Sequence, residues 1–146
     1  FANKGRAEAH VIEILTEAAP LPYRAYLRKR GVSYILAGKT ELDRQLAMEK
    51  LYRLFHIKML LICGGGAADW TFLQAGLVDE LSLVLSTVTD GSSGTASVFA
   101  QFPAQGAGQP VEFDLKTVQP LGGGGLHLRY LAKNARQSEE AGGSEL

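Results

Sequence analysis

A nearly continuous apolar run at residues 57–63 (IKMLLIC), followed at once by three glycines, constrains the fold of this chain most strongly. A short apolar run bounded by glycine is typical of a strand that is buried on both faces of a parallel sheet. We therefore expect an interior parallel strand at residues 57–63. After the glycines, residues 67–75 favour a helix that ends before Gly76, a residue suited to the left-handed conformation of a helix end.

Strand and helix patterns alternate along the rest of the chain. Apolar and β-branched runs predict further strands, whereas proline at a first helical position and apolar residues at helical spacing predict helices. The expected strands are residues 10–16, 32–37, 80–87, 111–118 and 126–132, and the other expected helices are residues 22–30 and 41–55. The last two strands are expected to form an antiparallel pair. This order predicts a three-layer mixed α/β fold with a mainly parallel sheet and antiparallel carboxy-terminal strands.

Composition narrows the classes of protein to which the chain can belong. Its 146 residues carry 15 basic and 15 acidic side chains, so no net charge draws it to nucleic acid or to an anionic membrane. A single cysteine, Cys63, excludes an internal disulfide and fits the cytoplasm, where we expect the protein to act. The three histidines are widely spaced, which argues against a metal site. We expect one domain at residues 1–133 and a disordered polar tail at residues 134–146.

The three glycines stand where a buried strand passes into a helix, a common position for ligands in α/β sheets. Without side chains, they allow a phosphate group to approach the backbone, and the helix start offers unpaired N–H donors. Tight packing alone would explain the same glycines equally well, so both interpretations stay open. No Lys-Ser or Lys-Thr follows them, which argues against the P-loop hydrolases.

Residues 61–83 (LICGGGAADWTFLQAGLVDELSL) resemble the reductase domain of bifunctional riboflavin-biosynthesis deaminase-reductases, most clearly at residues 72–81. Residues 26–43 (YLRKRGVSYILAGKTELD) and the later Thr89, Asp90 and Gly91 fit that family in the same order. The resemblance implies a dihydrofolate-reductase-like fold, in which NADPH lies across the carboxyl ends of the strands with the glycine turn against its phosphates.

The resemblance also implies which residues bind the cofactor. They come from the glycine turn and from the ends of two earlier strands: Thr16, Gly38, Lys39, Gly64, Gly65, Gly66, Ala67, Ala68 and Asp69. Among them, Lys39 is the cation expected nearest to a 2′-phosphate, although an exposed loop lysine is an equally good explanation.

Three residues depart from the family pattern. Cys63 stands where relatives commonly have a glutamate that contacts the substrate, so it is the candidate substrate-binding residue, and we expect it to be a buried strand-end thiol. Asp69 places an acid beside the glycine turn, which favours the helix but disfavours a pyrophosphate. Trp70 is expected to pack inside the protein. No catalytic residue can be identified, because the adjacent Asp79 and Glu80 would point to opposite faces of a strand and are expected to be structural.

The resemblance thus implies an NADPH-dependent reductase, similar to 5-amino-6-(5-phosphoribosylamino)uracil reductases, that transfers hydride to a ribosylamino-pyrimidine or a related small molecule. A noncatalytic or regulatory NADPH-binding relative is the alternative, and a structural dimerisation module is a third possibility. A homodimer is implied by the resemblance and by the apolar carboxy-terminal strands. We also expect an upstream segment to supply an opening strand that residues 1–146 lack.

Overall fold

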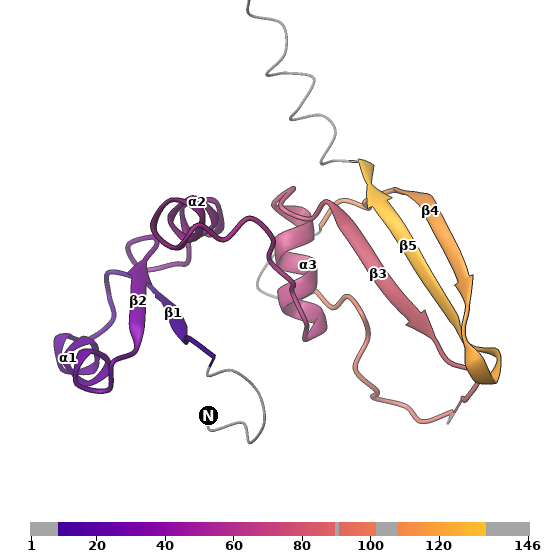
Figure 1. The fold of residues 1–146 in the computed structure, drawn as a ribbon, viewed down its shortest axis with the longest axis horizontal. Helices are drawn as coiled ribbons and strands as arrows, with labels where there is room; N and C mark the ends of the chain where they lie inside the picture. Colours follow the sequence, from indigo (N-terminus) through magenta and orange to yellow (C-terminus); the bar gives the residue numbers. More distant parts are fainter. Residues whose placement is uncertain (1–8, 90, 102–107, 134–146) are drawn as a thin grey trace, which may run out of the picture. The chain divides into compact units, whose positions relative to one another are not determined.

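The computed structural model describes residues 9–89, 91–101 and 108–133, and these residues fall into two compact units that divide between Leu60 and Leu61. Figure 1 shows the helices and strands of both units. The tail at residues 134–146 and Asp90, both named in the sequence analysis, lie outside the described residues.

The first unit contains four elements: β1 (Ile12–Leu15), α1 (Leu21–Lys29), β2 (Ser33–Leu36) and α2 (Arg44–Phe55). The two strands pair in parallel, from Ile12 opposite Ser33 to Leu15 opposite Leu36. All four elements confirm the predicted order of strand, helix, strand and helix. A parallel pair connected through a helix places the carboxyl ends of both strands at the same edge.

The core of the first unit lies between α2 and the two strands. Ile35, Ala37, Ala47 and Leu51 are buried there, and partly buried aliphatic side chains of β1 pack around them. The helix begins later than residue 41 because Asp43 adopts an extended conformation and accepts a hydrogen bond from Leu46 N at 2.9 Å. That contact satisfies one N–H group of the first helical turn.

The strand predicted at residues 57–63 is wrong: this segment has no regular secondary structure. The side chains of Met59 and Leu61 are 80% and 78% exposed. A strand depends on backbone hydrogen bonds to a neighbouring strand, and none of the strands in the described ranges pairs with these residues. Their apolar character alone therefore does not make them a strand.

The second unit contains α3 (Gly66–Gln74), β3 (Glu80–Leu85), β4 (Phe113–Pro120) and β5 (Leu126–Ala132). A short 3₁₀ turn, Gly122–Gly124, connects β4 to β5. The three strands form an antiparallel sheet in the order β3-β5-β4 (Figure 1). The predicted antiparallel pair of carboxy-terminal strands is confirmed.

The chain is therefore mixed α/β, as predicted, but its sheets differ from the expected arrangement. The described strands form one parallel pair and one antiparallel three-stranded sheet, instead of a single mainly parallel sheet. The difference arises because residues 57–63 form no strand and because β3 pairs with the later β5. Among the described residues, no helix is both long and apolar enough to cross a lipid bilayer.

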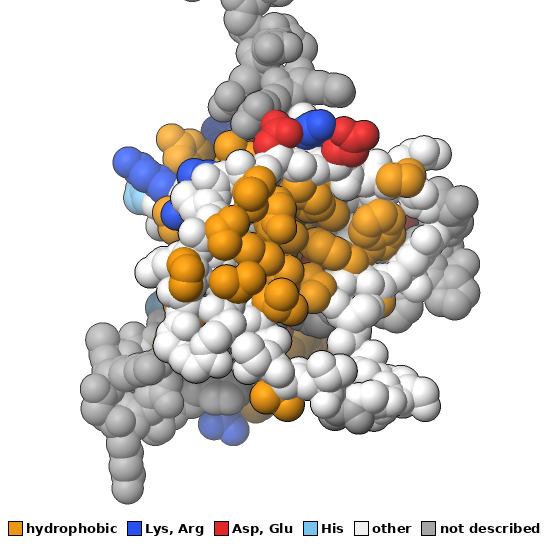
Figure 2. Space-filling model, turned by 90° about the vertical axis from the view of Figure 1, so that its right-hand side faces the viewer, with side chains coloured by type: hydrophobic (Ala, Val, Ile, Leu, Met, Phe, Trp, Pro, Cys, Tyr) orange, Lys and Arg blue, Asp and Glu red, His pale blue; other side chains and the backbone are white. Residues whose placement is uncertain are grey.

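The antiparallel sheet has one apolar and one polar face. Leu83, Leu128 and Val118 lie opposite one another across the three strands, so their side chains share a face. Figure 2 shows hydrophobic side chains gathered over this part of the molecule. Ser82 and Arg129 face the other way.

Candidate functional site

The glycine turn leads directly into the first turn of α3. Gly64 has a φ of +91°, a conformation that favours glycine, and Gly65 is the extended N-cap residue. No side chain caps the helix, and Ala68 N and Asp69 N both donate to Gly65 O, at 2.8 and 3.2 Å. Because the first N–H groups of a helix have no partner within it, the start of α3 offers donors to an anion.

The turn's glycines differ in the space around them. A Cβ atom on Gly65 would meet no atom within 4 Å, so the backbone here is open to a ligand. A Cβ atom on Gly66 would lie 2.3 Å from the carbonyl oxygen of Ser97, and Ala100 N donates to Gly66 O at 3.0 Å. Packing therefore explains why residue 66 is a glycine, whereas it does not explain the glycine at position 65.

Two of the departures from the family pattern lie at this turn. Cys63 is exposed, so the expectation of a buried thiol is wrong, because the segment before it is not a strand within a sheet. Oδ2 of Asp69 would be 3.8 Å from a Cβ atom on Gly64, and its Oδ1 is buried with no hydrogen-bond partner among the described residues. Asp69 thus adds a negative charge to the turn.

Trp70, on the same helix, packs as predicted. Its ring lies edge-on to that of Phe99, with 6.4 Å between the ring centroids. The contacts of Phe99 and Ala100 show that residues 97–100, which the sequence indicated only as part of a long loop, lie against the start of α3. No local sequence signal indicated this contact.

In the first unit, the structure brings Thr16, Gly38 and Lys39 together at the carboxyl ends of β1 and β2. Glu17 N donates to Gly38 O and Ala18 N donates to Lys39 O, both at 2.9 Å, so the two loops are joined by backbone hydrogen bonds. Gly38 has a φ of +94°. Lys39 is exposed and makes no ion pair with a described residue.

Sequence reasoning missed Arg24, whose guanidinium reaches the same strand ends. Its Nη2 donates to the carbonyl oxygen of Glu17, although the sequence indicated only a basic helix here. Its position in the first turn of a helix that follows a parallel strand is a signal that could have identified it.

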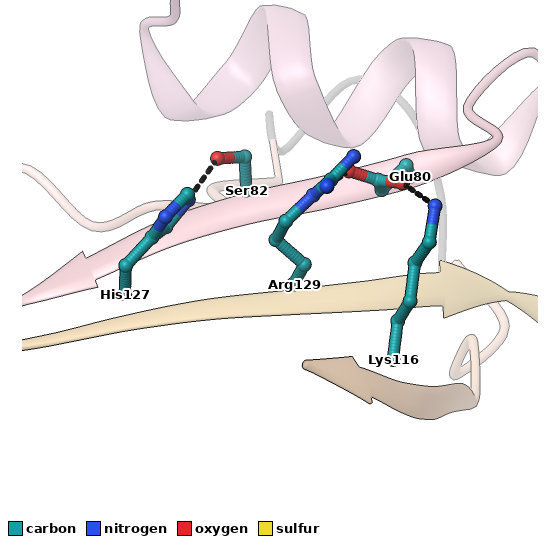
Figure 3. A network of polar contacts seen from close by, with 5 residues as sticks. All are labelled: Glu80, Ser82, Lys116, His127 and Arg129. Atoms are coloured by element: carbon teal, nitrogen blue, oxygen red, sulfur yellow. Dashed lines mark hydrogen bonds and ion pairs between the residues drawn. The ribbon is translucent and has the colours of Figure 1, made fainter. Parts of the chain in front are cut away.

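The polar face of the antiparallel sheet carries a network of side chains from three strands (Figure 3). Glu80 accepts hydrogen bonds from Lys116 Nζ at 2.7 Å and from Arg129 Nε at 2.5 Å. The hydrogen bond from Lys116, and after it the one from Arg129, holds the pKa of Glu80 below its ordinary value of 4.5. Ser82 Oγ and His127 Nε2 lie 2.8 Å apart. Glu80 begins β3, as predicted, and links this strand to β4 and β5.

In the described part of the chain, no three His, Cys, Asp or Glu residues gather in a way that could hold a metal ion.

Comparison with known proteins found a matching family model and curated relatives of this chain. The model of the RibD C-terminal domain family matches residues 3–127. A 2,5-diamino-6-ribosylamino-4(3H)-pyrimidinone 5′-phosphate reductase of Methanothermobacter thermautotrophicus is 32% identical over 84 residues, which are 58% of this chain and 38% of that protein. The Aquifex aeolicus protein of the same name is 32% identical over 77 residues, 53% of this chain and 34% of the relative.

Solved structures agree on the fold. A pyrimidine reductase-like protein of Corynebacterium diphtheriae matches 83% of this chain and 49% of its own, with a TM-score of 0.68 and 20% identity. RibD of Acinetobacter baumannii matches 84% of this chain and 37% of its own, with a TM-score of 0.61 and 23% identity.

The chain spans less than half the length of the two curated reductases named above. Because the family model covers the strand ends, the glycine turn and most of the antiparallel sheet, the chain belongs to the RibD C-terminal domain family.

Proposed function

We propose that this chain is the reductase domain of a riboflavin-biosynthesis enzyme and that it binds NADPH at the glycine turn. The observation that carries the proposal is the uncapped start of α3 behind Gly65, where the backbone is open and N–H donors are available. Unpaired N–H donors at a helix start and an open glycine backbone suit a pyrophosphate. The family membership supports a reductase over other phosphate-binding proteins.

The residues of the glycine turn fit the pyrophosphate of a dinucleotide. Backbone N–H groups of Gly66 and Ala67 would bind it. The bound nicotinamide would supply the hydride, and the protein would orient it and exclude water. The chain therefore need not supply a redox-active residue for the hydride transfer.

The proposed substrate is a ribosylamino-pyrimidine phosphate, as the names of the two relatives suggest. Cys63 occupies the substrate-contact position, and its exposed thiol is open to a ligand. A thiol is a weak hydrogen-bond acceptor, so substrate recognition must depend more on other groups than it does in relatives with a carboxylate. We further propose a dihydrofolate-reductase-like layering of the complete sheet, in keeping with the solved neighbours.

The direct test is a calorimetric titration of the protein with NADPH, repeated with Gly65→Val. A valine side chain would occupy the open space in front of the turn, so we expect affinity to fall by about tenfold or more, the effect of losing one or two charge-assisted hydrogen bonds. Gly122→Val is the matched control, because a Cβ atom there also meets no atom within 4 Å and the residue lies in the turn between β4 and β5. Equal affinity in all three proteins would refute the glycine-turn site.

An alternative function, a noncatalytic NADPH-binding relative, is favoured by the charge of Asp69 at the turn and by the loss of a carboxylate at Cys63. Turnover separates the two. A reductase consumes NADPH in the presence of the pyrimidine substrate, whereas the alternative binds NADPH and leaves its absorbance unchanged.

We also propose that the protein is a homodimer that buries the apolar face of the β3-β5-β4 sheet. Leu115 and Val118 of β4 and Leu85 of β3 lie on this face and are largely exposed in the single chain (Figure 2). A contiguous apolar surface on a single chain is typical of an interaction site. A two-fold axis would bring the same uncharged patch of a second copy against it.

A further inference from the structure

The polar face of the β3-β5-β4 sheet carries a row of hydrogen-bond donors from three strands. Arg129 of the central strand lies directly between Ser82 of β3 and Thr117 of β4. Neighbouring strands are about 4.8 Å apart, so the three side chains stand next to one another on the same face. Ser82 and Thr117 are exposed, and Arg129 is partly exposed. The row is therefore open to a ligand.

Glu80 holds the guanidinium of Arg129 by one edge. One carboxylate oxygen of Glu80 accepts from Arg129 Nε at 2.5 Å, and the other accepts from Lys116 Nζ at 2.7 Å (Figure 3). The Nη groups of Arg129 form no hydrogen bond with a residue that the structure describes. The contact with Glu80 thus orients the guanidinium and leaves its two Nη groups to donate side by side, an arrangement that suits an oxyanion.

Hydroxyl groups stand on both sides of this guanidinium. Ser82 Oγ lies 2.8 Å from His127 Nε2. When Nε2 carries the ring proton it donates to Oγ, and the hydroxyl hydrogen of Ser82 is then available to a ligand. Within the described ranges of the chain, the hydroxyl of Thr117 has no hydrogen-bond partner. Donors on three side chains match the three terminal oxygens of a phosphate monoester.

The charge of this face favours one phosphate group over a polyanion. Glu80 balances only one of its two cationic partners, Lys116 and Arg129, so the network keeps one positive charge. Asp114, which lies on the same face, has its own cation in Lys133, 3.7 Å away. A nucleic acid is bound by a broad surface of many cations. A single excess charge matches a single phosphate group.

Val84 gives the same face an exposed apolar side chain. It follows Ser82 by two residues on β3, so both side chains point to this face, and it is 63% exposed. An aliphatic side chain beside the donors suits the carbon skeleton of an organic phosphate.

We propose that Ser82, Arg129 and Thr117 bind the phosphate group of a small organic phosphate monoester, with Val84 against its carbon skeleton. This binding site goes beyond the proposed function, because it uses no residue of the glycine turn and needs no dinucleotide.

The test is a two-dimensional ¹H–¹⁵N NMR titration of the protein with glycerol 3-phosphate, compared with chloride at equal ionic strength. We expect saturable shifts of the backbone amides of Ser82, Thr117 and Arg129 with the phosphate and not with chloride. Shifts confined to residues 65–68 would assign the phosphate to the glycine turn and overturn the proposal. Shifts that do not saturate, or that chloride reproduces, would overturn it as well.

Substitutions within the row sharpen the test. We expect Arg129→Gln to weaken binding of glycerol 3-phosphate by about tenfold or more, as for the loss of a charge-assisted hydrogen bond. Lys133→Gln is the matched control, because it removes a cation that follows β5 and is paired with Glu112, and it should change the affinity less than about twofold. Thr117→Val keeps the ion pairs of Glu80 and guards against a folding defect in Arg129→Gln. It should weaken binding by about threefold or more, and unchanged affinity in either row variant would refute the proposal.

A single-stranded oligonucleotide separates a small ligand from a polymer. Binding no tighter than that of glycerol 3-phosphate supports the small ligand. Binding more than about tenfold tighter, with an affinity that falls steeply as salt is added, would show a surface for a polyanion and overturn the proposal.

Discussion

Single residues in this protein have roles that depend on charge partners from distant parts of the chain. Glu80 begins β3, yet its partners Lys116 and Arg129 come from β4 and β5. Because these bonds lower the pKa of Glu80, the folded state binds a proton there less readily than the unfolded state does. The resulting stabilisation is present above the ordinary value of 4.5 and is lost as the pH falls through the lowered pKa of the folded protein.

We therefore predict that Glu80→Gln lowers the melting temperature at neutral pH. The glutamine keeps the shape but leaves Lys116 and Arg129 without a counter-charge. The difference from the unchanged protein should shrink as the pH falls below 4.5. Thermal melts over a pH series would measure this, and a difference that is constant down to acid pH would contradict it.

A second single-residue prediction concerns the negative charge at the glycine turn, which Asp69→Asn removes. Removing a carboxylate beside a bound pyrophosphate should strengthen NADPH binding by roughly two- to fivefold, because charges at a helix start are worth about 0.3–1 kcal/mol. Calorimetry at low and high salt would measure the gain, which should be smaller at high salt. Weaker binding would instead indicate that the carboxylate positions the turn.

At the scale of elements, α2 depends on its N-cap. Asp43 accepts a hydrogen bond from Leu46 N, and the helix buries Ala47 and Leu51 in the core of the first unit. We predict that Asp43→Ala lowers the free energy of unfolding by about 1 kcal/mol. Glu49→Ala is the control, because its ion pair with Arg53 is exposed and contributes only about 0.3–0.5 kcal/mol. Urea denaturation of both variants should separate the two effects.

At the scale of the whole molecule, the apolar sheet face predicts self-association. Val118→Lys would place a charge in the proposed contact, so we expect a dimer in the unchanged protein and a monomer in this variant, measured by light scattering. Val84→Lys is the matched control, since Val84 is 63% exposed, compared with 49% for Val118, but lies on the opposite face of the sheet. A monomeric unchanged protein, or equal effects of both lysines, would contradict the proposed interface.

The sequence by itself predicted the helices and five of the six strands, because caps, glycine stops and apolar periodicity act within a few residues. It failed at residues 57–63, since a strand also needs a neighbour and apolar character does not supply one. Family resemblance predicted that the glycine turn and the strand ends bind the cofactor.

Only the tertiary structure distinguished Gly65, which faces open space, from Gly66, which packs against Ser97. It alone showed that Arg24 reaches the carbonyl of Glu17. The first fact depends on the contact of the glycine turn with residues distant in the sequence, and the second on how α1 folds back against the loop that precedes it. Local patterns determine where the helices begin and end, whereas strand pairing and the space and hydrogen-bond partners around a residue are determined by how the segments pack.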